Sequence, residues 1–448
     1  MTMMYYRIYR ALPALLILAI MIIIAQAHGA HAVQSNYTLL SFTLAPYECN
    51  SMPLNCTTDL RIILIPYYAN PFNVSLAGMP SLSSLPINYP SQGIRWTLIW
   101  LPDPARAGNG SRTYILVSRG TEDKLLIFLE PGGACTDYYT CWYPVPGVST
   151  VLTMNATYPN IWIDLFAYTG ILNRSNPLNP FRNWTYVFIP YDTGDVFSGD
   201  RVMEYCGIGI NGMMDCVTTY HVGFVDAIMA MRWAAAQGPW KQVVLAGSSA
   251  GGVGTILLSY YTVQIFNDSH LIVIDDSGPG LTSTVNPHFT FETTEQSWGY
   301  LELMTPEARE IVEETGEPLL GLEYEFQTIG KNVTFALYEM QEDLVMGTLF
   351  LGYTPNEYQQ VLLYYTGKLR QFAPNNFFRY LPIGYAHMIL VYPVLLPPNA
   401  FYTFSICGLP VYEWVDLLLE GKPIDIVQVT PYTCVINSTQ IVSNISLG

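Results

Sequence analysis

Short apolar runs alternate along the chain with stretches of helical hydrophobic spacing. The run Lys124–Leu129 is apolar almost throughout, which is typical of a strand buried on both faces of a sheet. This alternation of strands and helices predicts an α/β fold with a mostly parallel central sheet flanked by helices. The predicted strands are Trp96–Leu101, Thr113–Val117, Lys124–Leu129, Tyr186–Ile189, Gln242–Ala246, Leu271–Ile274, Val333–Leu337 and Phe377–Pro382, and the predicted helices are Phe224–Ala236, a stretch ending near Ile265, Pro306–Thr315 and Val411–Glu420.

The first residues have the pattern of an export signal. Arg7 and Arg10 precede an apolar run over 11–25, and small-residue cleavage sites end at Ala27 and Ala32. The run is short for a membrane span, so we expect cleavage, with membrane anchoring only if this leader stays uncleaved. The predicted organisation is a signal peptide over 1–32, cleaved after about 27 or 32, an N-terminal extension over 33–90 with a strand at Leu60–Pro66, and one α/β catalytic domain over 91–448.

Composition narrows the class of protein. Half of the residues are hydrophobic and only 12% are charged, as in a well-buried globular protein. The net charge of −16 argues against nucleic acid or an anionic membrane as the main partner.

The cysteines and glycosylation sequons agree with export. All eight cysteines follow the leader, and pairing neighbours gives Cys49–Cys56, Cys135–Cys141, Cys206–Cys216 and Cys407–Cys434, one of the 105 connectivities that eight cysteines allow. Their spacing does not suit zinc, so we expect no metal. Eleven Asn-x-Ser/Thr sequons predict a glycosylated surface, and the protein is expected to be secreted or at the cell surface.

A strand, a turn of small residues and a helix meet around Ser249. The strand Gln242–Ala246 leads into Gly247–Gly252 (GSSAGG), and an apolar helical stretch follows. This frame is typical of a nucleophilic serine on a sharp elbow, with the nearby backbone N–H groups at a helix N-terminus available to an oxyanion. In the G-x-S-x-G register the predicted nucleophile is Ser249, with Ser248 at the x position.

A second motif follows the buried strand Lys124–Leu129. The residues Glu130–Cys135 (EPGGAC) place two glycines directly after the strand, where backbone N–H groups can face a reacting carbonyl. We therefore predict an oxyanion hole made by the N–H groups of Gly132, Gly133 and Ala250.

Chain order narrows the rest of the triad. In α/β-hydrolases the order is serine, acid, histidine. His387 follows a predicted strand in a loop, where a triad histidine is expected, and Asp343 follows the strand before it. Asp276, next to Asp275 after Leu271–Ile274, is the reserve acid. The other histidines fit less well: they lie in the leader (His28, His31), before the serine (His221), directly after one helix (His270) or with no strand before them (His288).

Taken together, these motifs make the chain resemble the pectin acetylesterase/Notum carboxylesterases, which are secreted α/β-hydrolases. The resemblance spans about 95–421 and implies Ser249 as nucleophile, Asp343 as acid, His387 as base and Gly132, Gly133 and Ala250 as the oxyanion hole, with no metal or cofactor. It is carried by Lys124–Cys135 (KLLIFLEPGGAC), Asn179–Phe181 (NPF), Ile189–Asp200 (IPYDTGDVFSGD), His221–Val225 (HVGFV), Gly247–Gly252 (GSSAGG), Asp275–Gly278 (DDSG), Asp343, Tyr385–Ile389 (YAHMI) and Gly408–Gly421.

The chain departs from this family at several positions. Pro131 stands where the family often has glycine, Asp192 replaces its usual cysteine, and the place beside the oxyanion glycines that is aromatic in lipid-cleaving animal members is glycine-like here. We therefore predict a serine esterase for acetyl or other short acyl esters, with an acylated polysaccharide as a candidate substrate. The alternatives are a secreted lipid acyl-hydrolase, a serine peptidase on the same fold, and a non-catalytic cell-surface binding protein.

Overall fold

A computed structural model describes residues 61–142 except 68, and residues 166–438 except 167, 210, 268–269 and 331–332. The predicted signal peptide and the predicted Cys49–Cys56 pair lie outside the described residues.

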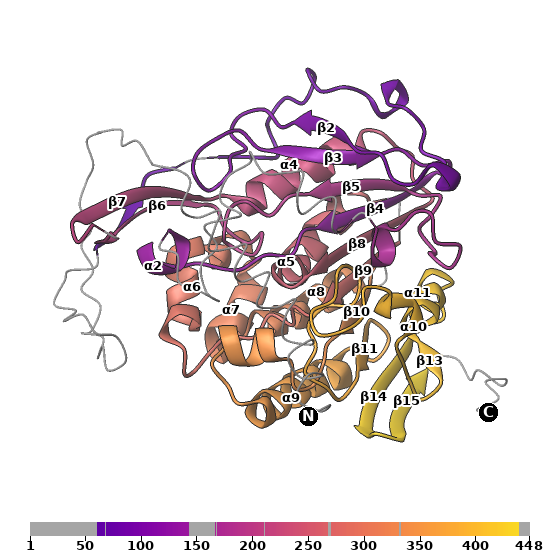
Figure 1. The fold of residues 1–448 in the computed structure, drawn as a ribbon. Coiled ribbons are helices and arrows are strands. Elements are labelled where there is room, and N and C mark those ends of the chain that lie inside the picture. Colours follow the sequence, from indigo (N-terminus) through magenta and orange to yellow (C-terminus); the bar gives the residue numbers. More distant parts are fainter. Residues whose placement is uncertain are drawn as a thin grey trace, which may run out of the picture.

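A ten-stranded sheet forms the centre of the protein, in the order β15-β14-β11-β10-β9-β8-β4-β5-β3-β2 (Figure 1). The strands from β14 to β5 are parallel, and antiparallel strands complete both edges. This arrangement confirms the predicted mostly parallel sheet. The strands are β2 (Thr97–Trp100), β3 (Tyr114–Ser118), β4 (Lys124–Leu129), β5 (Thr185–Ile189), β8 (Gln242–Ser248), β9 (Leu271–Asp276), β10 (Val333–Tyr338), β11 (Phe377–Leu381), β14 (Ile424–Thr430) and β15 (Thr433–Ser438).

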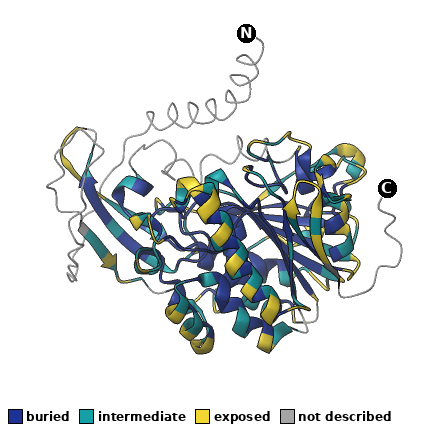
Figure 2. Cartoon of the chain, turned by 90° about the horizontal axis from the view of Figure 1, so that it is seen from below, coloured by how far each residue is buried: buried dark blue, intermediate teal, exposed yellow. Residues whose placement is uncertain are grey.

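Helices cover both faces of the sheet, so the central strands are apolar on both sides. Along β8, Val243 and Leu245 pack in one core while Val244 and Ala246 pack in the other, and all four are 0% exposed. The outer faces of the helices carry the exposed residues (Figure 2). The helices are α2 (Tyr138–Cys141), α4 (Gly223–Ala235), α5 (Ala250–Ile265), α6 (Phe291–Trp298), α7 (Pro306–Thr315), α8 (Leu322–Ile329), α9 (Pro355–Phe372), α10 (Ala400–Thr403) and α11 (Val411–Leu419).

Shorter elements complete the described chain. The predicted strand at Leu60–Pro66 is confirmed as β1, which pairs with the β6–β7 hairpin in a separate antiparallel sheet at one side of the molecule (Figure 1). These elements are β1 (Arg61–Ile65), β6 (Arg201–Ile208), β7 (Met214–His221), β12 (Ser405–Ile406), β13 (Leu409–Pro410), the 3₁₀-helices Leu82–Ser84, Pro90–Gln92, Gly170–Leu172, Pro287–Phe289, Tyr300–Leu303 and Pro318–Gly321, and the π-helix Leu344–Phe350.

Three of the four predicted disulfides are confirmed. Cys135–Cys141 closes the loop after β4, Cys206–Cys216 crosses the β6–β7 hairpin, and Cys407–Cys434 ties β15 to the segment before α11. Within the described residues, no helix has both the length and the apolar character that crossing a membrane requires.

Candidate active site

The register of the sheet brings the predicted motifs to one edge. Leu129 at the end of β4 pairs with Gly247, and Ser248 at the end of β8 pairs with Asp276. Because parallel strands end on the same side, the glycine loop, the serine elbow and the loops after β9 and β10 share the carboxyl edge of the sheet.

Ser249 occupies a strained turn between β8 and α5. Its φ of 54° and ψ of −118° lie in a region that non-glycine residues rarely adopt. Glycines permit the close approach around it, since a Cβ on Gly247 would collide with the Gly251 carbonyl and a Cβ on Gly251 with the Leu129 carbonyl. The serine is 5% exposed and directly precedes the N-terminus of α5. This is the geometry expected of a nucleophile elbow.

The structure brings Asp343 and His387 together. Asp343 Oδ2 lies 2.7 Å from His387 Nδ1, and the two residues are 0% and 2% exposed. The other oxygen, Oδ1, accepts hydrogen bonds from the N–H groups of Val345 and Met346 at 2.7 and 2.9 Å, at the start of the π-helix. An ionised Asp343 accepts the proton of Nδ1–H, so the tautomer assigned to His387 leaves Nε2 as a proton acceptor.

The reserve acid, Asp276, has a different place. Its carboxylate accepts from the N–H groups of Ile389 and Leu390 at 2.9 Å each and from the Ser248 hydroxyl at 2.6 Å. Burial raises the pKa of Asp276 to about 6, and these hydrogen bonds together with the nearby His387 limit the rise. Asp276 thus joins the serine elbow to the segment after His387, whereas Asp343 is hydrogen-bonded to the imidazole itself.

The serine and the histidine do not hydrogen-bond in this structure. Within the described residues, Ser249 Oγ has one partner, the Gly132 carbonyl at 3.5 Å. The N–H of Gly133 belongs to the same trans peptide as this carbonyl, so it points in the opposite direction, away from Ser249 Oγ. The predicted oxyanion donors Gly132, Gly133 and Ala250 nevertheless all line the cavity into which Ser249 opens. The catalytic roles of these residues stay predictions.

An apolar cavity extends from Ser249 between α5 and the segments after β9 and β10. Its empty volume is about 780 Å³ when the solvent in its open mouth is counted. Its wall consists mainly of large apolar side chains, among them Ile256, Leu257, Leu281, Phe289, Trp298, Tyr300, Met304, Met346, Phe350 and Leu351. No sequence motif signals this wall, because its residues come from segments far apart in the chain.

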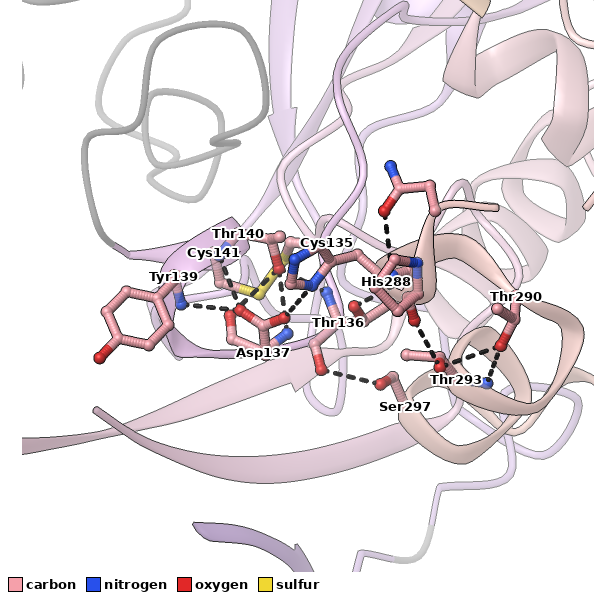
Figure 3. A network of polar contacts seen from close by, with 12 residues as sticks. Cys135, Thr136, Asp137, Tyr139, Thr140, Cys141, His288, Thr290, Thr293 and Ser297 are labelled. Carbon is pink, nitrogen blue, oxygen red and sulfur yellow. Dashed lines mark hydrogen bonds and ion pairs between the residues drawn. A yellow bond between two sulfur atoms is a disulfide. The ribbon is translucent and has the colours of Figure 1, made fainter. Parts of the chain in front are cut away.

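A polar network ties the glycine loop to the cavity wall (Figure 3). Asp137, just beyond the glycine loop, accepts from the N–H groups of Tyr139 and Thr140, and its other oxygen lies 2.6 Å from His288 Nδ1. The Thr136 hydroxyl donates to the His288 carbonyl at 2.9 Å. His288 precedes the cavity residue Phe289, so this pair joins the two sides of the cavity. Sequence reasoning missed the Asp137–His288 pair; the spacing Asp137-x-x-Thr140 of a capping box signalled only the helix start.

The Asp137–His288 pair predicts a pH dependence of stability. Burial opposes charge on both groups, but their hydrogen bond and mutual attraction outweigh it, so the pKa of His288 is raised and that of Asp137 is lowered. The stabilisation by His288 is fully present below its unfolded pKa of about 6.5 and is lost as pH rises through the raised value; that of Asp137 is lost only in acid. In urea unfolding, His288→Asn should therefore lower the free energy of unfolding most at about pH 6 and progressively less toward about pH 9. The same substitution at exposed His270 is the control; an equal, pH-independent cost for both variants would contradict the pairing.

The remaining histidine of the core has a structural place. His221 is 0% exposed, with Nδ1 at 2.8 Å from the Thr193 carbonyl and Nε2 at 2.9 Å from the Tyr205 hydroxyl. Burial lowers its pKa to about 4. His221 also lies near Cys135 and Cys141, and Glu204 lies near Cys206 and Cys216, but in both groups the cysteines form a disulfide and offer no thiolate to a metal ion.

Comparison with known proteins points to one family. The family model of Pectinacetylesterase matches residues 105–284. The palmitoleoyl-protein carboxylesterase notum2 of Xenopus laevis is 28% identical over 162 residues, which are 36% of this chain and 29% of that protein. The palmitoleoyl-protein carboxylesterase NOTUM of Schmidtea mediterranea is 29% identical over 138 residues, 30% of this chain and 23% of that protein. The matched part thus spans less than a third of the length of these curated relatives.

The fold extends the likeness beyond the matched sequence. A crystal structure of the Wnt deacylase Notum from Drosophila superposes with a TM-score of 0.51 at 17% identity, covering 76% of this chain and 97% of the other. A second crystal form gives a TM-score of 0.50 over 74% of this chain. At this identity the likeness shows the fold, which is the predicted α/β-hydrolase fold. Together with the sequence matches, it confirms that the chain resembles the pectin acetylesterase/Notum family.

Proposed function

We propose that this protein is a serine carboxylesterase whose nucleophile is Ser249. The observation that carries the proposal is the Asp343–His387 pair at the same sheet edge as a serine of positive φ that opens into an apolar cavity. His387 Nε2 takes the hydroxyl proton as Ser249 Oγ attacks the ester carbonyl, and it returns the proton to the leaving alcohol. Water then hydrolyses the acyl-enzyme with the same histidine as base.

Two movements complete this site when substrate binds. Ser249 Oγ turns from the Gly132 carbonyl toward His387; catalytic hydrogen bonds are often long or absent before substrate arrives. The peptide between Gly132 and Gly133 turns over so that its N–H, with that of Ala250 at the start of α5, meets the oxyanion. Two consecutive glycines allow this rotation because neither has a Cβ.

The cavity supports an acyl group longer than acetyl. The wall of large apolar side chains extends well beyond the part that an acetyl group can contact. Each further methylene group that such a wall buries contributes about 0.8 kcal/mol. We therefore propose that the acyl chain enters this cavity and that medium or long acyl esters are preferred over the short ones that the sequence predicted. The curated relatives named above are palmitoleoyl-protein carboxylesterases. For this chain we propose only an acyl ester, met outside the cell, where disulfides persist.

A series of p-nitrophenyl esters tests the proposal. The kcat/KM is expected to rise from acetate through octanoate, by up to about fourfold for each buried methylene. A peptide amide of matched size should not be cleaved. A kcat/KM that falls from acetate onward would contradict the proposed acyl site and support the short-chain preference predicted from the sequence.

Met304→Trp provides a structural check on the same site. Met304 is half-buried in the cavity wall, so a larger ring there shortens the space for the chain. We expect octanoate hydrolysis to fall about tenfold or more while acetate hydrolysis changes little, since each lost methylene contact counts in kcat/KM. Met79→Trp, also half-buried but away from the cavity, is the matched control.

A further inference from the structure

A fully buried carboxyl group lies behind the Asp343–His387 pair. Glu339 directly follows β10 and is 0% exposed. Its N–H donates to the Tyr380 carbonyl at 3.3 Å, which fixes it at the end of the strand. A turn closed by the N–H of Asp343, donating to the Met340 carbonyl at 3.2 Å, brings Asp343 back beside it. Glu339 is thus the neighbour of the carboxylate that holds the histidine.

Several polar atoms around Glu339 lack partners. Within the described residues, neither of its carboxylate oxygens has a hydrogen-bond donor, and Asp275 Oδ2 and the Tyr358 hydroxyl are also unpaired. All three side chains are 0% exposed. Two ionised carboxylates have no donor to share and repel each other, so such a group at this depth is stable only with protons between its members.

The hydrogen bonds of Asp343 identify which member is ionised. Asp343 accepts from two backbone N–H groups and from His387, and donors of this kind favour a charged carboxylate. Glu339 has no such donors. Burial raises its pKa well above the usual range, and the charges of Asp343, Asp275 and Asp276 raise it further.

Tyr358 completes the group from α9. Gly347 of the π-helix packs directly against its ring, because a Cβ there would collide with it. Burial raises the pKa of Tyr358 well above its usual value, and the nearby charges of Glu339, Asp343 and Asp275 raise it further. A neutral tyrosine can donate to one oxygen of Glu339 while the other oxygen carries the proton.

We propose that Glu339 is a neutral positioning residue that donates a hydrogen bond to Asp343 while accepting one from the Tyr358 hydroxyl. The inference rests on the proposed function only in taking Asp343 as the carboxylate that holds the catalytic histidine. A neutral donor fixes Asp343 and stabilises its charge. An ionised Glu339 would instead repel Asp343 and add a second negative charge near the imidazole.

Substitutions that keep or remove the donor test this role. Glu339→Leu removes it, and we expect kcat/KM to fall about tenfold to a hundredfold, as for loss of a hydrogen bond to a charged group. Without this donor, Asp343 holds the imidazolium more strongly, so the acidic limb of the pH–rate profile should shift to higher pH. Glu339→Gln keeps an N–H donor and should retain most of the wild-type activity. The acidic limb of its pH–rate profile should lie at the same pH as in the wild type.

A second buried acid is the matched control. Glu325 on α8 is 6% exposed and accepts from the Ser259 hydroxyl at 2.7 Å, away from the triad. Glu325→Leu should lower stability without moving the pH profile. If Glu339→Leu leaves the profile and kcat/KM unchanged, or if Glu339→Gln moves the acidic limb downward, the proposed neutral donor is wrong.

An infrared measurement keeps the proposal falsifiable if Glu339→Leu does not fold. A protonated carboxylic acid has a carbonyl stretch apart from that of carboxylates, and wild type at neutral pH should show such a band that Glu339→Gln lacks. An identical spectrum for the two proteins overturns the proposal. Ser249→Ala separates it from the function: turnover that persists in that variant refutes the esterase mechanism, while an inactive Ser249→Ala with an unmoved Glu339→Leu profile refutes only the role of Glu339.

Discussion

Ser249→Ala is expected to lower kcat for ester hydrolysis by several powers of ten, because no other group in the proposed mechanism can form the acyl-enzyme. The fold should persist, since the Ser249 hydroxyl makes only a 3.5 Å hydrogen bond to the Gly132 carbonyl. Steady-state kinetics with p-nitrophenyl octanoate, together with mass-spectrometric detection of an organophosphonate adduct on the wild-type serine, measure both parts of the expectation.

Ser248→Ala is the control for the neighbouring hydroxyl. Ser248 is 0% exposed and donates to Asp276 at 2.6 Å, so this variant should lose about 1 kcal/mol of stability and keep most of its turnover. Near-normal kcat in Ser249→Ala, or an adduct on a different residue, would refute the proposed nucleophile.

Asp343→Asn is expected to lower kcat by about three to four orders of magnitude with little change in fold, as for the triad aspartate of serine proteases. An amide at this position can present its N–H₂ group to His387 Nδ1, which favours the tautomer with the proton on Nε2 and removes the base. One oxygen remains for the N–H groups of Val345 and Met346, so the start of the π-helix is kept.

Asp276→Asn is the matched variant at the reserve acid. Its carboxylate accepts from the Ile389 and Leu390 N–H groups and the Ser248 hydroxyl, and an N–H₂ group cannot accept from any of them. We expect a loss of about 1–3 kcal/mol of stability and a smaller effect on kcat than at Asp343. Thermal unfolding and kinetics on one ester compare the two. Collapse of kcat in Asp276→Asn with normal kcat in Asp343→Asn would reverse the assignment.

Much of the fold could be predicted because buried strands and amphipathic helices leave strong local signals. The structure has β4 at Lys124–Leu129 and α7 at Pro306–Thr315, the same bounds that the sequence predicted. The hairpins β6–β7 and β14–β15 were missed, since charged residues such as Glu204, Asp215 and Asp425 interrupt the apolar runs of their strands. Helix α9 was also missed, although Thr354, Pro355 and Glu357 form a recognisable N-terminal signal.

The site was predictable only as far as chain order carries information. Order along the chain selected Asp343 and His387, which the structure places in hydrogen-bond contact. Chain order alone could not exclude Asp276 as the triad acid. Its carboxylate is occupied by the N–H groups of Ile389 and Leu390, and their position depends on the folded structure. The cavity wall and the group around Glu339 arise from side chains far apart in sequence. They have no local period or spacing to detect.

The stretch that matches the family model ends at residue 284, and most of the apolar wall lies after it, from Phe289 to Leu351. The serine elbow and the glycine loop fall inside the matched stretch. In evolutionary terms, the nucleophile and most of the side chains that would choose the acyl group are carried by separate lengths of gene, although the second length also carries Asp343 and His387. Substrate preference can therefore diverge by mutation around these two residues while the serine elbow is retained, so a relative's substrate is a weaker guide here than its fold.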